Sequence, residues 1–425
     1  MIDRRNAGAV YKFRELLYRY GCGSDHIVFK YGGNMKQAAL AIKDKLVELR
    51  QWDKTYKALR KHLDTLPVGM PATFSGVERR LLKAMFSIDD ARLAVYMDWH
   101  FETADAIFAR AGAPLGLSRE EISDRLSAME KKGIIFARQT DGVWEYALHP
   151  LIIGMYEMQL NRMNPGFYLD LREYVTKIWG IEYLTSAIPQ MRVVPVEKSI
   201  TPEHPIATYD EIRKIIQNTE KGISIAECIC RKAKEMVGEP CKKTDRKEIC
   251  LGFRDFGDMY TRNGWGRPIT KEEALAHLDQ AEKEGLVIQP SNEKEPQFIC
   301  LCCGCCCGIL EMMRTMPRPA DFTASNYYVA LDLESCNGCG KCVRRCQMGA
   351  FEIKDKKAVL NLDKCIGCGL CVTTCKTQSL KLVKKDMETV PPESTEAMFE
   401  TIMAGKKGGV GRLVAAAKGA MGMKP

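Results

Sequence analysis

The C-terminal third of the chain contains one cysteine pattern twice, as CNGCGKCVRRC at 336–346 and CIGCGLCVTTC at 365–375. In each copy, two, two and three residues separate the four cysteines. A tight loop with this spacing can present its first three thiolates to one iron–sulfur cube while its backbone N–H groups face the sulfides. The fourth cysteine points away and reaches a second cube. The pattern therefore predicts two [4Fe–4S] clusters.

Both copies lie inside a longer repeat, ALDLESCNGCGKCVRRCQMGAFEI at 330–353 and VLNLDKCIGCGLCVTTCKTQSLKL at 359–382. This part of the chain, about residues 326–385, closely resembles the bacterial two-cluster ferredoxins. The resemblance implies a ferredoxin-like βαβ domain and a ligand set for each cluster. The first cluster would be held by Cys336, Cys339, Cys342 and Cys375. The second would be held by Cys365, Cys368, Cys371 and Cys346.

The chain departs from the ferredoxin pattern at Gln347 and Lys376, where the family usually has proline after the fourth cysteine. This difference affects the expected reduction potential and solvent exposure of the clusters, but not the identity of their ligands. A zinc ribbon is the alternative, but it usually pairs two C-x2-C knuckles and needs fewer cysteines. From Asn326 to Asp386 there are eleven Lys and Arg against six Asp and Glu. With two clusters the domain is near neutral, which favours a fixed subunit or fused domain over a diffusing carrier.

A second group of cysteines lies in the middle of the chain and is less familiar. Its ten members are Cys228, Cys230, Cys241, Cys250, Cys300, Cys302, Cys303, Cys305, Cys306 and Cys307. It resembles a cysteine-rich module that precedes two-cluster ferredoxin domains in anaerobe proteins. The CCG modules of heterodisulfide reductases, which bind non-cubane clusters, match poorly because their long C…CC…C-x2-C spacing is absent. The hypotheses are a third [4Fe–4S] cluster, a zinc site, and a reactive thiol or unusual cluster.

Local geometry suggests how these thiols could be brought together. In an extended strand the side chains of residues i and i+2 share a face, so Cys228/Cys230 and Cys300/Cys302 could each present a pair of thiolates. Gly304 and Gly308 would let the chain turn tightly between the later cysteines. A basic neighbour, Arg231 or Lys232, could offset the negative charge of a cluster; the alternative is a solvated helix face.

The N-terminal half is predicted to be mainly helical, with apolar residues at helical spacing over 1–65. At 117–148, Ser118 and Glu121 form a capping box, and a hairpin signal around Asp141-Gly142 follows the helix. Residues 269–300 repeat this unit at a fixed offset, with Thr270 and Gly285 in matching positions. We therefore expect two helix–hairpin units that resemble winged helices.

These patterns predict an α+β, multidomain chain. Its expected parts are a helical region at 1–70, a winged-helix-like domain at 71–200, a second helix–hairpin unit with the cysteine-rich module at 201–320, the ferredoxin-like domain at 321–386, and a basic tail at 387–425. The end of the tail has no acidic residue and five basic ones: Lys406, Lys407, Arg412, Lys418 and Lys424. We expect a frayed terminus there, with contact to an acidic partner or a membrane surface as the sharper alternative.

Composition limits the cellular setting and the partners. Eighteen of the nineteen cysteines fall between Cys228 and Cys375, and only Cys22 stands apart. The start of the chain lacks the apolar segment of a secretory signal, so we expect a reducing, cytoplasmic compartment in which dense cysteine binds metal. No run is long enough for a membrane span. The net charge of +9 is mild and gives no strong case for nucleic acid.

The resulting hypothesis is an iron–sulfur electron-transfer protein, a subunit or dedicated partner of an anaerobic oxidoreductase. One alternative is a winged-helix regulator that senses oxidation and binds DNA through the helix at 118–133, whose balanced charge disfavours this function. Another is a cysteine-rich reductase with a substrate-active middle cluster. No phosphate loop or dinucleotide fingerprint is present, so we expect redox protein partners and no bound nucleotide.

Overall fold

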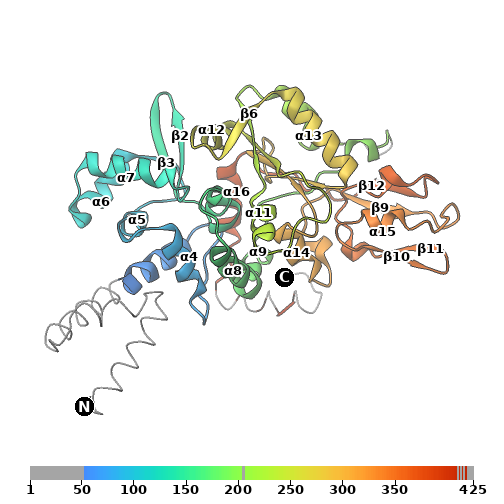
Figure 1. Ribbon diagram of the computed structural model, residues 1–425, viewed down its shortest axis with the longest axis horizontal. Helices are drawn as coiled ribbons and strands as arrows, with labels where there is room; N and C mark the ends of the chain where they lie inside the picture. The colour runs from blue at the N-terminus through green and yellow to red at the C-terminus, as the bar shows by residue number, and fades with distance from the viewer. Residues whose placement is uncertain (1–51, 203–205, 409–410, 412–413, 415–416, 419–425) are drawn as a thin grey trace, which may run out of the picture. The chain divides into compact units, whose positions relative to one another are not determined.

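A computed structural model describes residues 52–425 except 203–205, 409–410, 412–413, 415–416 and 419–425 (Figure 1). The chain divides into one unit of residues 1–57 and a second of residues 58–425. Most of the predicted N-terminal helical region therefore lies outside the described residues, as does Cys22. Residues 52–63 are helical, in agreement with the apolar spacing there. As predicted, the fold is α+β.

The first helix–hairpin unit begins the second part of the chain. Its elements are α4 (Val77–Met85), α5 (Ile88–Ala94), β1 (Glu102–Thr103), α6 (Ala104–Leu115), α7 (Arg119–Lys131), β2 (Phe136–Thr140) and β3 (Val143–Ala147). The strands form an antiparallel sheet in the order β1-β3-β2. The capping box of Ser118 and Glu121 is present, and Asp141 and Gly142 both have positive φ at the hairpin turn. The predicted capped helix and hairpin are confirmed, and the winged-helix interpretation stays a prediction.

The second unit repeats the same local structure in a different sheet. Thr270 caps α13 (Lys271–Glu284), Gly285 ends it at a φ of 79°, and β7 (Val287–Pro290) pairs with β8 (Phe298–Cys302). The sheet also contains β4 (Ile223–Glu227), β5 (Glu248–Phe253) and β6 (Gly266–Ile269), in the order β6-β4-β5-β8-β7. The repeat is confirmed locally and extends to the strand order, because β5 pairs with β8 as β1 pairs with β3, so that β5-β8-β7 corresponds to β1-β3-β2.

Short helices carry the chain between and around these sheets. They are α8 (Pro165–Tyr174), α9 (Gly180–Leu184), α10 (Ile212–Asn218), α11 (Ile229–Met236), α12 (Arg254–Arg262) and α14 (Gly308–Arg314). The α12 helix contacts β4, β5 and β6 of the larger sheet and also β2 of the smaller one. From its end, Arg262 and Asn263 both donate to the buried Glu130 of α7. These contacts join the two helix–hairpin units into one body.

The predicted ferredoxin-like part forms one end of this body (Figure 1). It contains β9 (Tyr327–Leu331), α15 (Lys341–Arg345), β10 (Phe351–Lys354), β11 (Lys357–Leu360) and β12 (Leu380–Lys384). Strand β9 pairs with β12, and β10 pairs with β11, both antiparallel. Buried Tyr327, Val329 and Leu382 pack with the cysteines of both loops in a single core. The first and last strands thus close the repeated segment on itself.

The segment after the ferredoxin-like part is not simply a frayed tail. Helix α16 (Thr395–Ala404) places Phe399 edge-on against Trp99 and His149. Lys406, one of the five basic residues of the tail, donates to the backbone carbonyl oxygens of Asp64 and Leu66. Arg412 and Lys424 lie outside the described residues. At least the beginning of the tail is therefore part of the folded body. Along the described chain, no helix combines the length and the apolar character needed to span a bilayer.

A buried ion pair ties several connecting segments together. The guanidinium of Arg192 contacts Asp210 at 3.1 Å and donates to the carbonyl oxygen of Glu293 at 2.7 Å, and only 4% of each side chain of the ion pair is exposed. Replacing Arg192 with leucine should lower the free energy of unfolding by about 3–5 kcal/mol, because Asp210 is left buried without its cation. Anaerobic denaturant titration measures this change.

The matched control is the exposed pair of Arg119 and Asp105, whose side chains are 68% and 57% exposed. Arg119→Leu should change the free energy of unfolding by less than about 1 kcal/mol, because solvent already screens that pair. Equal effects of the two substitutions would contradict the role assigned to Arg192.

Candidate functional site

The first predicted set of cluster ligands lines one pocket. Cys336, Cys339 and Cys342 come from the loop before α15 and its first turn, and Cys375 reaches the same pocket from the second loop. The backbone N–H of Ala358 points to the Cys336 sulfur at 3.5 Å. Such N–H groups stabilise a negatively charged sulfur. The four cysteines that the resemblance assigns to one cluster line this pocket together with Cys371 of the second loop.

The second set is more deeply buried. Burial, followed by the charge of Cys346, raises the pKa of Cys368 to about 12, and burial also raises the pKa of Cys365 and Cys371. The Cys346 thiol is close enough to act on all three, although it comes from the first loop. Neutral thiols are favoured in such surroundings unless a cation is present. A metal held by these thiols would supply that cation.

Glycine is required at the same place in both loops. Gly338 and Gly367 precede the second cysteine of each pattern and have φ values of 69° and 71°. A Cβ atom at Gly338 would collide with the carbonyl oxygen of Lys356, and one at Gly367 would collide with that of Tyr327. The backbone must therefore approach closely at both points, and this sets the shape of each cysteine loop.

This geometry agrees with the comparison with known families. Residues 335–387 match the model of the 4Fe–4S dicluster domain. This chain is an iron–sulfur protein. The match covers the ferredoxin-like end, here called the dicluster domain, and supports a role in electron transfer. No curated protein and no solved structure gives a significant match.

Exposure differs between the two ends of the dicluster domain. Cys339 is exposed, whereas Cys365 and Cys371 are buried and Cys368 is half-buried. The loop of the second set is covered by an earlier segment: the N–H of Val196 donates to the carbonyl oxygen of Cys368 at 3.1 Å, and Ser199 packs on Gly369. The first set therefore lies nearer to solvent than the second.

Gln347, which stands where ferredoxins usually have proline, connects the dicluster domain to the cysteine-rich module. Its amide oxygen accepts from the N–H of Gly304 at 3.0 Å, and its amide nitrogen donates to the carbonyl oxygen of Gly285 at 2.5 Å. Only 4% of Gln347 is exposed. Lys243 adds a bond from its ammonium group to the carbonyl oxygen of Arg344 at 3.1 Å. The missing proline is evident from the sequence, but this contact between distant segments is not.

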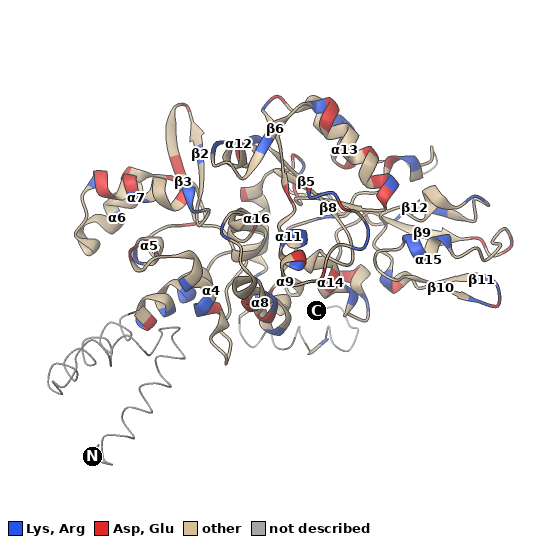
Figure 2. Cartoon of the chain, in the orientation of Figure 1, with Lys and Arg blue, Asp and Glu red and all other residues tan. Residues whose placement is uncertain are grey.

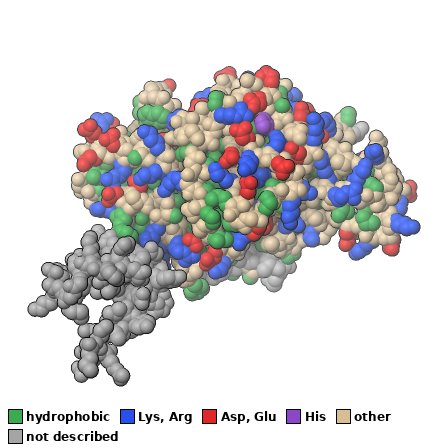
Figure 3. Space-filling view, viewed as in Figure 1, with side chains coloured by type: hydrophobic (Ala, Val, Ile, Leu, Met, Phe, Trp, Pro, Cys, Tyr) green, Lys and Arg blue, Asp and Glu red, His purple; other side chains and the backbone are tan. Residues whose placement is uncertain are grey.

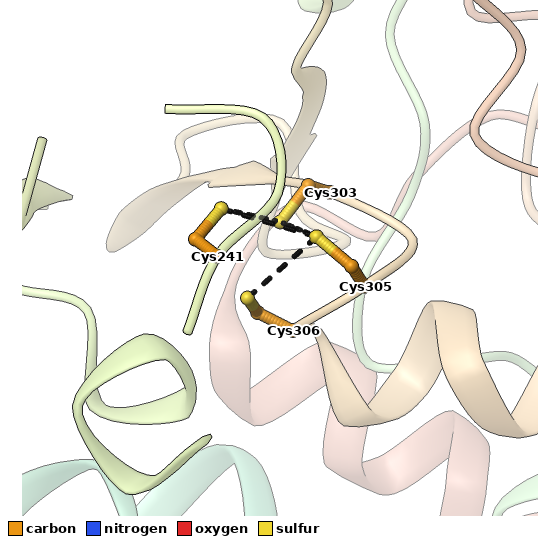
Figure 4. A group of neighbouring side chains, drawn as sticks. All are labelled: Cys241, Cys303, Cys305 and Cys306. Atoms are coloured by element: carbon orange, nitrogen blue, oxygen red, sulfur yellow. Dashed lines mark hydrogen bonds between the residues drawn. The ribbon is translucent and has the colours of Figure 1, made fainter. Parts of the chain in front are cut away.

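In the cysteine-rich module, four thiols converge on one point (Figure 4). Cys241 comes from the segment between α11 and β5, and Cys303, Cys305 and Cys306 come from the turn between β8 and α14. The Cys241 sulfur lies 3.6 Å from that of Cys303 and 3.9 Å from that of Cys305. The Cys305 sulfur lies 3.5 Å from that of Cys303 and 3.8 Å from that of Cys306. We call these residues the four-thiol group.

The thiols of this group differ in pKa. Hydrogen bonds from Cys303 and Cys306 lower the pKa of Cys241, and the same contact with Cys241 raises the pKa of Cys303 to about 12. The backbone N–H of Lys242 points to the Cys305 sulfur at 3.5 Å, and that of Lys243 points to the Cys241 sulfur at 3.5 Å. Four sulfurs with backbone donors and no carboxylate form a donor set suited to a thiolate-bound metal.

The other six middle cysteines do not belong to this group. Cys250 on β5 is paired with Cys300 on β8, and Cys302 lies two residues further along the same face. Cys228 and Cys230 lie at the N-terminus of α11, and Cys307 lies at that of α14. We call these residues the six-thiol group. The ten candidate ligands are therefore divided between two groups.

The local structure around the middle cysteines agrees only in part with the sequence-based expectations. Cys300 and Cys302 share a strand face as predicted, but the prediction of an extended Cys228/Cys230 pair is wrong because helix α11 begins there. Neither Gly304 nor Gly308 has a positive φ. Gly304 instead allows the close approach of the Gln347 backbone, and Gly308 is the first residue of α14.

Arg231 is the basic neighbour that the sequence proposed. It is 5% exposed, and its guanidinium donates to the carbonyl oxygen of Arg246 at 2.9 Å and points to the Cys303 sulfur at 3.8 Å. Burial opposes its charge, but Cys228 and Cys303 together raise its pKa. It therefore acts on both groups of thiols. Lys232 instead pairs with Glu227 at 2.8 Å.

Gly338 provides a test of the cysteine loops. We expect Gly338→Ala to remove about four irons, because the collision with Lys356 opens the loop that supplies three thiolates. Gly349→Ala is the control: Gly349 also has a positive φ, 67°, but no atom lies within 4 Å of the place that its added methyl group would occupy. It should cost about 1 kcal/mol of stability and retain all the iron. Iron and acid-labile sulfide counts distinguish these outcomes, and equal loss of iron in both variants would contradict the argument.

Proposed function

We propose that the protein relays single electrons through [4Fe–4S] clusters as a subunit or dedicated partner of an anaerobic oxidoreductase. The observation that carries the proposal is the contact of a dicluster domain with the cysteine-rich module through Gln347. A cluster in a module packed against a two-cluster domain suits a relay, because electron tunnelling falls steeply with distance. The cysteine density is suited to a reducing compartment such as the cytoplasm.

The proposed ligands follow the crossed arrangement of the cysteine loops. Cys375 completes the pocket of the first loop, and Cys346 lies with the three thiols of the second loop. When bound, each cluster accepts and gives one electron at a time. The protein contributes the thiolates, the backbone N–H groups and the burial that set the potential of each cluster.

The two ends of the dicluster domain have different roles in this proposal. The Cys339 end is exposed and is the point of exchange with an external redox protein. The Cys346 end contacts the cysteine-rich module through Gln347 and Lys243. In this proposal electrons pass between the protein surface and the middle module through the dicluster domain. A third cluster in that module would extend the relay.

The surface around the exposed end is basic. Arg344 and Lys356 are exposed and lie beside Gly340 and Gly338, the two glycines that flank Cys339. More Lys and Arg than Asp and Glu side chains are visible on this end in Figure 3. Complementary charge guides the encounter of two proteins and raises the association rate. We therefore propose an acidic redox protein as the partner.

The alternative of a DNA-binding regulator receives no support from α7. Its Arg119 is paired with Asp105 and its Arg125 with Asp89, and the following Lys132 is paired with Asp90. Figure 2 also shows acidic residues along α6 and α7. A helix that enters a DNA groove needs basic side chains directed at phosphates.

The metal content tests the electron-transfer proposal. Protein isolated without oxygen should contain at least about eight irons and eight acid-labile sulfides, and after reduction its EPR spectrum should show interacting clusters. Cys375→Ser should alter the same signal as Cys336→Ser, and Cys346→Ser the same signal as Cys365→Ser. Stoichiometric zinc with little iron would refute the proposal, and signals that follow the sequence order of the cysteines would refute the crossed ligands.

Charge reversal tests the partner. Arg344→Glu combined with Lys356→Glu should lower the rate of electron transfer from a reduced acidic ferredoxin about tenfold at low salt, because the attraction is lost. The difference should shrink at high salt, where charges are screened. Stopped-flow absorbance gives the rates, and Lys131→Glu on α7 is the control. A rate independent of salt and of the reversal would exclude an acidic partner at this end.

A further inference from the structure

The spacing of the sulfurs separates two kinds of metal site. In the four-thiol group all sulfurs lie within 4.8 Å of one another. One ion with metal–sulfur bonds near 2.3 Å places its four sulfurs about 3.8 Å apart. This matches the observed separations of 3.5 to 3.9 Å. Four cysteines around a cube stand further apart, because each binds a different iron.

The dicluster domain supplies an internal comparison. Among the described residues, no second set of three cysteine, histidine or carboxylate side chains meets within 4.8 Å. No three cysteines of the dicluster domain, and no three of the six-thiol group, therefore meet as closely as those of the four-thiol group. By this criterion the six-thiol group is similar to the dicluster sets and differs from the four-thiol group.

The six-thiol group is nevertheless one connected set. Cys250 and Cys300 are partners across β5 and β8, and Cys302 lies on the same face of β8 as Cys300. The backbone N–H of Cys228 donates to the carbonyl oxygen of Lys247 at 2.9 Å, directly before β5. The start of α11 therefore lies next to the strand that carries Cys250, and Gln289, the partner of Cys300 on β7, reaches the Cys307 sulfur at the start of α14.

Ordinary packing does not account for this group. A buried cysteine is normally a small apolar residue, but here six converge and four of them remain partly exposed. The buried Gln289, which is paired with Cys300 across the sheet, directs its amide nitrogen to the Cys307 sulfur at 3.8 Å. The backbone N–H of Leu310 also serves Cys307, and that of Arg231 serves Cys228. Similar N–H groups face Cys336 and Cys346 in the dicluster domain.

We propose that the cysteine-rich module contains two separate centres: a polynuclear iron–sulfur cluster held by the six-thiol group and a single tetrahedral metal ion, such as zinc, held by the four-thiol group. The proposal rests on the relay described above and places its third cluster at Cys228, Cys230, Cys250, Cys300, Cys302 and Cys307. Arg231 lies between the two centres and offsets the negative charge of both.

Two double variants of the full chain, isolated without oxygen, test the division. The wild type should contain about twelve irons, about twelve sulfides and one further metal ion. Cys250→Ser with Cys300→Ser should remove about four irons and four sulfides and retain the further ion. Cys241→Ser with Cys305→Ser should remove one metal ion and leave the sulfide count unchanged. Iron and zinc are counted by mass spectrometry and sulfide by colorimetry.

The outcomes are separable from those that test the relay itself. The EPR signals of the dicluster domain serve as the folding control and should persist in both variants. The division is refuted if both variants lose the same metals, if the first retains all its iron and sulfide, or if the second loses about four irons with sulfide. If the first variant does not accumulate, a wild-type count of about eight sulfides refutes the third cluster and about twelve supports it. Absence of the dicluster signals in the wild type would instead refute the relay.

Discussion

The fold has to hold many thiols close together inside protein, where each thiolate needs a nearby positive charge. Burial raises the pKa of the thiols of the second dicluster set, and in the middle module neighbouring thiols compete for protons. The chain meets this requirement with short loops whose N–H groups face the sulfurs and with one buried guanidinium, Arg231. The helices and sheets around the cysteines fix these donors in place. Metal ions supply the remaining positive charge.

The dicluster domain could be predicted from sequence because its information is local. Each loop supplies three cysteines within seven residues, and Gly338 and Gly367 fix the backbone around them. The capped helix and hairpin at 117–148 could likewise be predicted from Ser118, Glu121 and the turn at Asp141. In these segments neighbouring residues determine the structure, so spacing and residue type are sufficient.

The middle module could not be resolved in the same way because its groups depend on distant contacts. Cys241 meets Cys303 across 62 positions of the sequence, and Cys250 meets Cys300 only because β5 pairs with β8. Sequence spacing therefore identified all ten cysteines but not their division. It suggested an extended Cys228/Cys230 pair where the chain begins a helix. The pairing of β8 with β5, like that of β3 with β1 in the first helix–hairpin unit, joins segments far apart in the sequence, and no local signal records it.

Gln347 also limits how freely the dicluster domain could be exchanged during evolution. Proline at this position could accept no bond from Gly304 and donate none to Gly285, so both backbone groups would lose their partner at a buried surface. A domain transplanted from a free ferredoxin would bring that proline with it. The domain and the cysteine-rich module are thus expected to be inherited together, with the glutamine as a mark of chains in which the two are joined.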